Sequence, residues 1–194
     1  MPRTLACLLA LVVLAGCGGD DEPAAADVEL AQALEEGGVA LVMRHAITEP
    51  QTDREEKVGD CATQRNLTDE GREQARAIGR DVEELGVPVD KVMASPLCRT
   101  TETAELAFGD VEPSMALLSA GEEATPEDDR RIRRLKEMAS APDGSATVLV
   151  SHTGNIGGAF DESVQEGDIV VVRDGEVLGV VGADDWERLA EAAG

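Results

Sequence analysis

Short apolar runs and amphipathic stretches alternate along most of this chain. Residues 39–43 and 146–150 are runs of five apolar side chains rich in valine, a pattern typical of strands buried in a sheet. The same reasoning predicts shorter strands at 91–94 and 115–118 and a hairpin-like pair of strands near 168–181. The chain therefore has enough strand-forming segments for one central sheet.

Helices are predicted between these strands. The clearest follows Thr68, a candidate N-cap, and carries apolar side chains at helical spacing until Gly86. Another begins at Ser95 and Pro96, which have the order of an N-cap followed by proline at the first helical position. The predicted helices cover residues 28–36, 69–85, 96–108, 126–139 and 184–192.

This alternation predicts an α/β fold, a three-layer α/β/α sandwich with a mostly parallel central sheet. The 194 residues are enough for one domain with a sizeable core. Ligands of such sheets bind in the crevice at the carboxyl ends of the strands. The polar segment 47–65 follows the first strand and is predicted to form a loop over that crevice.

The charge of the chain is extreme, with 40 Asp and Glu against 17 Lys and Arg and a formal net charge of −23. Such a field repels phosphate backbones, so nucleic acid is not an expected partner. Two interpretations stay open: an ordinary acidic protein of an extracytoplasmic compartment, or adaptation to high salt, which screens self-repulsion. In either case, a site for an anionic substrate requires a local concentration of arginine.

The amino terminus is predicted to be a targeting signal. Arg3 precedes an apolar stretch that is too short to span a membrane as a mature helix. The stretch ends in Leu-Ala-Gly-Cys17, which resembles a lipoprotein lipobox; this implies cleavage before Cys17, diacylglycerol on its thiol, and export to the periplasmic or extracellular face of a membrane. An ordinary secretory signal with a chance cysteine is the alternative. The predicted parts are a lipoprotein signal peptide at 1–16, a flexible lipid-anchored tether at 17–27 and a folded domain at 28–194.

Two cysteines, Cys61 and Cys98, remain in the predicted domain. Export favours a disulfide between them, because an even number of cysteines in an oxidising compartment is usually paired. The alternative is two small buried side chains that never meet.

The chain has only two histidines, and both follow predicted strands. Arg44 and His45 end the first strand, and His152 ends the strand at 146–150. Arg99 lies one turn into the helix that begins after the second strand. Free backbone N–H groups and the helix dipole favour anions at such places, and the guanidinium fork matches phosphate oxygens. The arginines that an anionic substrate requires are thus present.

Four segments carry a family resemblance through their order and spacing: 41–46 (LVMRHA), 64–75 (QRNLTDEGREQA), 95–104 (SPLCRTTETA) and 148–152 (VLVSH). Together the segments resemble the histidine phosphatase superfamily, the phosphoglycerate mutase-like group, and its small single-domain branch in particular. The resemblance implies a phosphoglycerate mutase-like fold and phosphoryl transfer that needs neither a metal nor a cofactor.

The resemblance also implies a role for each residue. His45 would attack phosphorus and become a transient phosphohistidine, which water then hydrolyses. Arg44, Arg99 and His152 would hold the phosphoryl oxygens and stabilise the charge in transfer. Thr48 is a further candidate for a hydrogen bond to the phosphate, and a purely structural role explains this loop threonine equally well.

The chain departs from the family pattern in two respects. Ala46 stands where the family often has glycine after Arg-His. The general acid that protonates the leaving group is not identified by the motifs. Glu122 and Glu123 lie in the region where mutase-like members carry it, and Glu49 and Asp53 are further candidates. A substrate with a good leaving group would need little protonation.

The predicted function is that of an exported, lipid-anchored phosphatase acting on a phosphorylated small molecule or an envelope phosphate group, with a membrane contact through lipid only. The alternatives are a non-catalytic phosphate-binding lipoprotein, a mutase-like phosphotransferase, a metal site of two histidines and carboxylates, and a structural anchor without a site. In the last case the histidines would be buried hydrogen-bonding groups and the arginines surface ion-pair partners.

Overall fold

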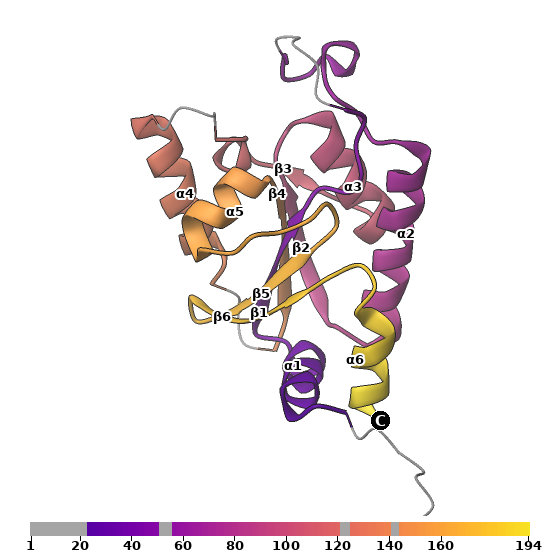
Figure 1. The fold of residues 1–194 in the computed structure, drawn as a ribbon. Helices are drawn as coiled ribbons and strands as arrows, with labels where there is room; N and C mark the ends of the chain where they lie inside the picture. Colours follow the sequence, from indigo (N-terminus) through magenta and orange to yellow (C-terminus); the bar gives the residue numbers. More distant parts are fainter. Residues whose placement is uncertain (1–22, 51–55, 121–124, 141–143) are drawn as a thin grey trace, which may run out of the picture.

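The computed structural model describes residues 23–50, 56–120, 125–140 and 144–194. A six-stranded sheet with the strand order β3-β2-β4-β1-β5-β6 forms its centre (Figure 1). β1 and β4 are buried along nearly their whole length, as expected of apolar runs covered on both faces. The strands are β1 (Val39–Arg44), β2 (Val89–Ala94), β3 (Glu112–Pro113), β4 (Ala146–Ser151), β5 (Ile169–Arg173) and β6 (Glu176–Val181).

The sheet is mostly parallel. β4 lies between β1 and β2 and runs parallel to both, and β3 continues the parallel part at one edge. β5 and β6 form the predicted hairpin and add two antiparallel strands beside β1. β1 is therefore a central strand, and its carboxyl end lies beside that of β4.

Helices cover both faces of the sheet, which confirms the predicted three-layer α/β/α sandwich (Figure 1). α1, α2, α3 and α6 pack on the larger core at one face, and α4 and α5 pack on the second core at the other. Two short 3-10 helices are η1 (Cys61–Thr63) and η2 (Met115–Leu117). The α-helices are α1 (Ala25–Glu36), α2 (Asp69–Glu84), α3 (Cys98–Phe108), α4 (Pro126–Met138), α5 (Thr153–Phe160) and α6 (Trp186–Ala193).

Local sequence signals explain where two of these helices begin. The hydroxyl of Thr68 accepts a hydrogen bond from the backbone N–H of Gly71, as its prediction as the α2 N-cap requires. Thr125 and Asp128 form a reciprocal capping box at the start of α4. Both helices then turn an apolar stripe toward the sheet.

The strand predicted at 115–118 is wrong. That segment is η2, which buries Leu117 in the second core, and the edge strand lies earlier, at β3. β3 contains Pro113, which has no N–H to donate and is therefore confined to an edge position.

Helix boundaries also differ from the predictions. α3 begins at Cys98 with Leu97 as its N-cap, later than predicted, and the hydroxyl of Ser95 lies 2.9 Å from Nε2 of His152. α1 begins at Ala25, inside the segment predicted to be tether. α5 was not predicted at all, because its glycine-rich sequence hides the helical period. One of these glycines, Gly158, allows close packing: a Cβ there would lie 2.6 Å from the side chain of Ile132 on α4.

Within the described ranges, no helix combines the length and apolar character needed to cross a membrane. The predicted signal peptide and Cys17 lie outside the described residues.

Candidate active site

A cavity of about 400 Å³ opens at the carboxyl ends of β1 and β4. The two strands pair in register, with Arg44 opposite Ser151, so the residues that follow them, His45 and His152, meet at one edge of the sheet. Their ring centroids are 5.5 Å apart. The cavity is lined by Arg44, His45, Glu56, Arg65, Arg99, Ser119, Ala120, His152, Thr153 and Gly154.

A backbone contact fixes the orientation of His45. The Nδ1 atom lies 2.9 Å from the carbonyl oxygen of Ala46, and a carbonyl can only accept a hydrogen bond. Nδ1 therefore carries the proton, and Nε2 holds the free lone pair. Burial, and after it the positive charge of nearby arginines, lowers the pKa of His45 to about 3. At neutral pH the ring is therefore uncharged, the form in which an imidazole can act as a nucleophile.

His152 is held from the neighbouring strand. Its Nε2 lies 2.9 Å from the hydroxyl oxygen of Ser95, which directly follows β2. Complete burial, together with the charge of Arg99, holds the pKa of His152 well below its usual range. Both histidines are thus neutral in the ligand-free protein, and the positive charge in the cavity comes from arginine.

Three arginines, Arg44, Arg65 and Arg99, line the cavity. Each has a buried Nε–H group that has no hydrogen-bond partner among the described residues. Burial lowers the pKa of Arg44 and of Arg99, since desolvation disfavours the charged form. Unpaired buried donors are costly, and a bound oxyanion would satisfy them.

The carboxylate of Glu56 partly neutralises this arginine cluster. Its Oε1 accepts hydrogen bonds from Nη1 of Arg99 at 2.7 Å and from the backbone N–H of Arg65 at 3.0 Å. Glu56 is the one carboxylate among the described residues that line the cavity.

The other rim of the cavity is built by the start of α5. Thr153 and Gly154 occupy its first turn, where free backbone N–H groups and the positive end of the helix dipole favour an anion. The amide of Asn155, fully buried on the same helix, bonds the backbone of Leu118 and Ala120 and so holds that segment at the cavity.

A turn before β5 supports the carboxyl end of β1 from behind. The backbone N–H of Gly167 donates to the carbonyl oxygens of Arg44 and His45. Gly167 has a φ of +93°, and a Cβ there would lie 2.5 Å from the side chain of Gln74. Gln74 in turn bonds Ile47 and Glu166, so only glycine fits this position.

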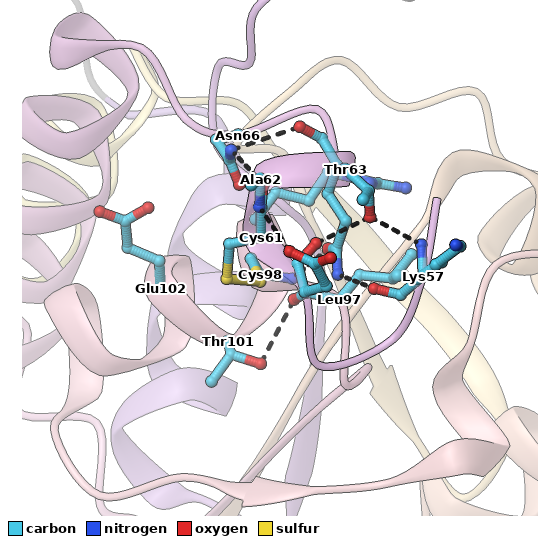
Figure 2. The surroundings of a disulfide bond; sticks show 12 residues. Lys57, Cys61, Ala62, Thr63, Asn66, Leu97, Cys98, Thr101 and Glu102 are labelled. Atoms are coloured by element: carbon cyan, nitrogen blue, oxygen red, sulfur yellow. Dashed lines mark hydrogen bonds between the residues drawn. A yellow bond between two sulfur atoms is a disulfide. The ribbon is translucent and has the colours of Figure 1, made fainter. Parts of the chain in front are cut away.

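The predicted disulfide between Cys61 and Cys98 is present, with the Cα atoms 5.7 Å apart (Figure 2). It ties η1 to the first residue of α3, directly before Arg99. The side-chain oxygen of Gln64 accepts a hydrogen bond from the backbone N–H of Cys98 at 2.7 Å, which adds a second link. The segment that carries Glu56 and Arg65 is thereby fixed to the helix that carries Arg99.

The structure brings four predicted residues together, Arg44, His45, Arg99 and His152. Two other candidates lie elsewhere. The hydroxyl of Thr48 donates to Glu166 behind the site, and Glu49 lines a different hollow beside the disulfide. The remaining proton-donor candidates, Asp53, Glu122 and Glu123, lie outside the described residues.

Two charged residues of the cavity, Arg65 and Glu56, were not predicted from the sequence. Arg65 lies inside the second family-like segment, 64–75, and that position was the available signal. Glu56 had no comparable signal, because it is one of many charged residues in the polar segment 47–65. Glu166 was also missed; its Oε1 lies 3.8 Å from both Nη2 of Arg44 and Nδ1 of His45.

No group of three His, Cys, Asp or Glu side chains that could hold a metal ion occurs in the described part of the chain.

The low pKa of His45 makes stability sensitive to acid. Below pH 6.5 the unfolded chain binds a proton at His45 and the folded chain does not, so the free energy of unfolding falls as the pH falls toward 3. The expected loss from His45 is about 1.4 kcal/mol for each pH unit in this window. Urea denaturation between pH 7 and pH 5 would measure it.

His45→Asn is the matched control for this experiment, because an asparagine amide can still donate to Ala46 and does not titrate. The variant should lose less stability than the parent over the same pH range, while the acid sensitivity of the carboxylates stays common to both proteins. Equal pH slopes in the two proteins would contradict the assignment of a buried, neutral His45.

Parts of this chain are similar in sequence to a known family and to known phosphatases. The family model described as histidine phosphatase superfamily (branch 1) matches residues 40–119. The mitochondrial serine/threonine-protein phosphatase Pgam5 of Drosophila grimshawi is 42% identical over 55 residues, which cover 28% of this chain and 19% of that protein. The Drosophila virilis protein of the same name is 41% identical over 61 residues, 31% of this chain and 21% of the relative. The chain thus spans about a fifth of the length of these curated relatives.

Solved structures of similar fold cover more of the chain. The protein histidine phosphatase SixA complexed with tungstate aligns with a TM-score of 0.53 at 16% identity, over 72% of this chain and 92% of that one. A phosphohistidine phosphatase SixA from Agrobacterium tumefaciens gives 0.55 at 14% identity, over 75% and 98%. An alpha-ribazole-5'-P phosphatase from Escherichia coli gives 0.51 at 18% identity, over 73% and 93%. The chain thus resembles the histidine phosphatase superfamily (branch 1) over residues 40–119 and shares the fold of these solved structures.

Proposed function

We propose that this protein is an exported, lipid-anchored phosphatase that hydrolyses phosphomonoesters through a phosphohistidine on His45. The observation that carries the proposal is the juxtaposition of an uncharged His45 with three arginines whose buried Nε–H groups are unpaired within the described residues. Such a cavity is complementary to a phosphoryl group beside a nucleophile. The similar proteins named above are phosphatases of different substrates, and they agree with the proposal at the level of phosphoryl transfer.

The geometry supports a two-step reaction. Nε2 of His45 attacks phosphorus while its Nδ1–H stays bonded to the carbonyl of Ala46, which keeps the ring in place. Arg44, Arg65, Arg99 and the first turn of α5 stabilise the charge on the phosphoryl oxygens. The ring of His152, whose centroid lies 5.5 Å from that of His45, closes the phosphate pocket on the opposite side. Water then attacks the phosphohistidine and releases phosphate.

The substrate is proposed to be a phosphorylated small molecule or a phosphate group of the cell envelope. A cavity of about 400 Å³ accommodates one phosphoryl group and a small part of its ester. The chain as a whole is strongly acidic, with a formal net charge of −23, and would repel a nucleic-acid substrate.

Purified protein assayed on a panel of phosphomonoesters tests the activity. We expect phosphate release with equal rates in the presence and absence of a chelator, because arginines supply the positive charge that a metal provides elsewhere. Activity that disappears with chelator would overturn the metal-independent mechanism. Binding of inorganic phosphate without turnover of any ester would overturn the enzyme and favour a phosphate-binding lipoprotein.

Membrane attachment is proposed to depend on Cys17. Replacing Cys17 with serine in the full chain should abolish incorporation of labelled fatty acid and move the protein from the membrane fraction to the soluble fraction. Mass spectrometry of the mature parent should find a diacylated cysteine at its amino terminus. A parent protein that carries no lipid, or is not exported, would contradict this part of the proposal.

A further inference from the structure

The phosphohistidine route leaves one chemical need unmet. When the ester bond breaks, the leaving oxygen of an alkyl phosphate needs a proton, and neither neutral histidine nor arginine is suited to donate it. A carboxyl group inside the cavity can do so. In the described part of the chain, the glutamates Glu49, Glu56 and Glu166 lie near this region; the nearby Asp168 does not line the cavity and accepts from the backbone N–H of Gln165.

Two of these three carboxylates are poorly placed. Glu49 lines the hollow beside the disulfide and not the catalytic cavity. Glu166 lies behind His45, where it accepts the hydroxyl of Thr48 and approaches the protonated Nδ1 atom. That side of the ring is opposite the attacking Nε2, so Glu166 is a positioning residue.

Glu56 alone among these three lines the catalytic cavity. Its side chain is 25% exposed, so it stands at the rim, where an ester leaves and water enters. Both of its hydrogen bonds, from Arg99 and from the backbone of Arg65, fall on Oε1. Arg99, which donates to this Oε1 atom, is also one of the arginines proposed to bind the phosphoryl group of the substrate.

We propose that Glu56 is the general acid and the general base of the reaction. This inference rests on the proposed phosphatase function. The incoming phosphoryl group competes with Glu56 for Arg99 and so releases the carboxyl group from that arginine. At the mouth of the cavity, Glu56 can then give a proton to the leaving oxygen and later take one from water.

The two steps together return Glu56 to its starting protonation state. In the first, Nε2 of His45 bonds to phosphorus, the bond from phosphorus to the ester oxygen breaks, and that oxygen takes the proton of Glu56. In the second, the oxygen of water bonds to phosphorus and the bond to Nε2 breaks. The Glu56 carboxylate takes one proton from that water and is ready for the next cycle.

Glu56→Gln tests the assignment, because glutamine keeps an oxygen acceptor for Arg99 and for the N–H of Arg65 but has no proton to give. Turnover is compared on 4-nitrophenyl phosphate, whose leaving group is stable as an anion, and on an alkyl phosphate, whose leaving group is not. We expect at least about a 100-fold loss on the alkyl ester and a loss of less than 10-fold on the nitrophenyl ester. The dependence of rate on leaving-group basicity should therefore become steeper.

Asp60→Asn is the matched control. It makes the same carboxylate-to-amide change on the same segment, at a side chain that caps η1 outside the cavity and whose acceptor oxygen the amide retains. This variant should behave like the parent on both esters. Equal losses on the two esters in Glu56→Gln would show that Glu56 only positions Arg99 and would overturn the proposal. A parent without activity on any ester would instead refute the phosphatase function itself.

Discussion

Replacing His45 with asparagine is expected to lower phosphatase turnover by at least about 1,000-fold, because the covalent route through Nε2 is lost. The structure makes asparagine the appropriate choice. Its amide nitrogen takes the place of Nδ1 and can still donate to the carbonyl of Ala46, which lies 2.9 Å from that atom in the parent. The change therefore removes the nucleophile with little disturbance of the strand end.

Trapping of the intermediate is the decisive measurement for this variant. The parent, quenched in alkali during turnover of a radiolabelled ester, should retain label that acid releases, as expected of a phosphorus–nitrogen bond. His45→Asn should retain none. Near-native thermal unfolding of the variant at neutral pH is the control for folding. Full turnover in His45→Asn, or label that resists acid, would contradict the assignment of the nucleophile.

Removal of the Cys61–Cys98 disulfide is expected to cost about 3 to 4 kcal/mol of unfolding free energy, since the bond closes a loop with a sequence separation of 37. Activity should fall as well, because the bond holds η1, and with it the segment that carries Glu56 and Arg65, against the helix that carries Arg99. Denaturant unfolding of the Cys61→Ala/Cys98→Ala variant, with turnover measured under native conditions, checks both effects.

Reductant provides an internal control for the disulfide prediction. It should shift the unfolding midpoint of the parent toward that of the double variant and leave the double variant unchanged. Unfolding midpoints that are the same in the parent and the double variant would mean that the disulfide does not stabilise the folded protein.

The parts of the site that sequence could predict are those attached to regular structure. The apolar runs of β1 and β4 predicted two buried strands, and simple counting along the chain then placed Arg44, His45 and His152 at their carboxyl ends. Arg99 was predictable for the same reason, since it follows β2 at the start of a helix. In each case the position of the side chain depends on a local pattern that a reader of the sequence can see.

The parts that sequence could not predict depend on tertiary contacts. Glu56 and Arg65 reach the cavity because the disulfide and the Gln64–Cys98 hydrogen bond hold an irregular segment against α3. α5 has glycine where most helices have larger side chains, because it packs closely on α4, so it shows no helical period. The prediction of Ser95 as an N-cap was wrong, since α3 begins at Cys98, and the contact of the Ser95 hydroxyl with His152 joins two segments far apart in the sequence.

The central place of β1 has a consequence for the order in which the cavity can form during folding. The strand that leads to His45 comes early in the chain, but both of its sheet neighbours, β4 and β5, come from residues 146–173. The backbone carbonyl groups of Arg44 and His45 accept hydrogen bonds from the N–H of Gly167, which lies in the same late segment. Because such distant pairings form slowly, we expect the cavity to be completed only at the end of folding. A partly synthesised or carboxyl-terminally truncated chain would contain His45 but lack the strands and the turn that hold it in place.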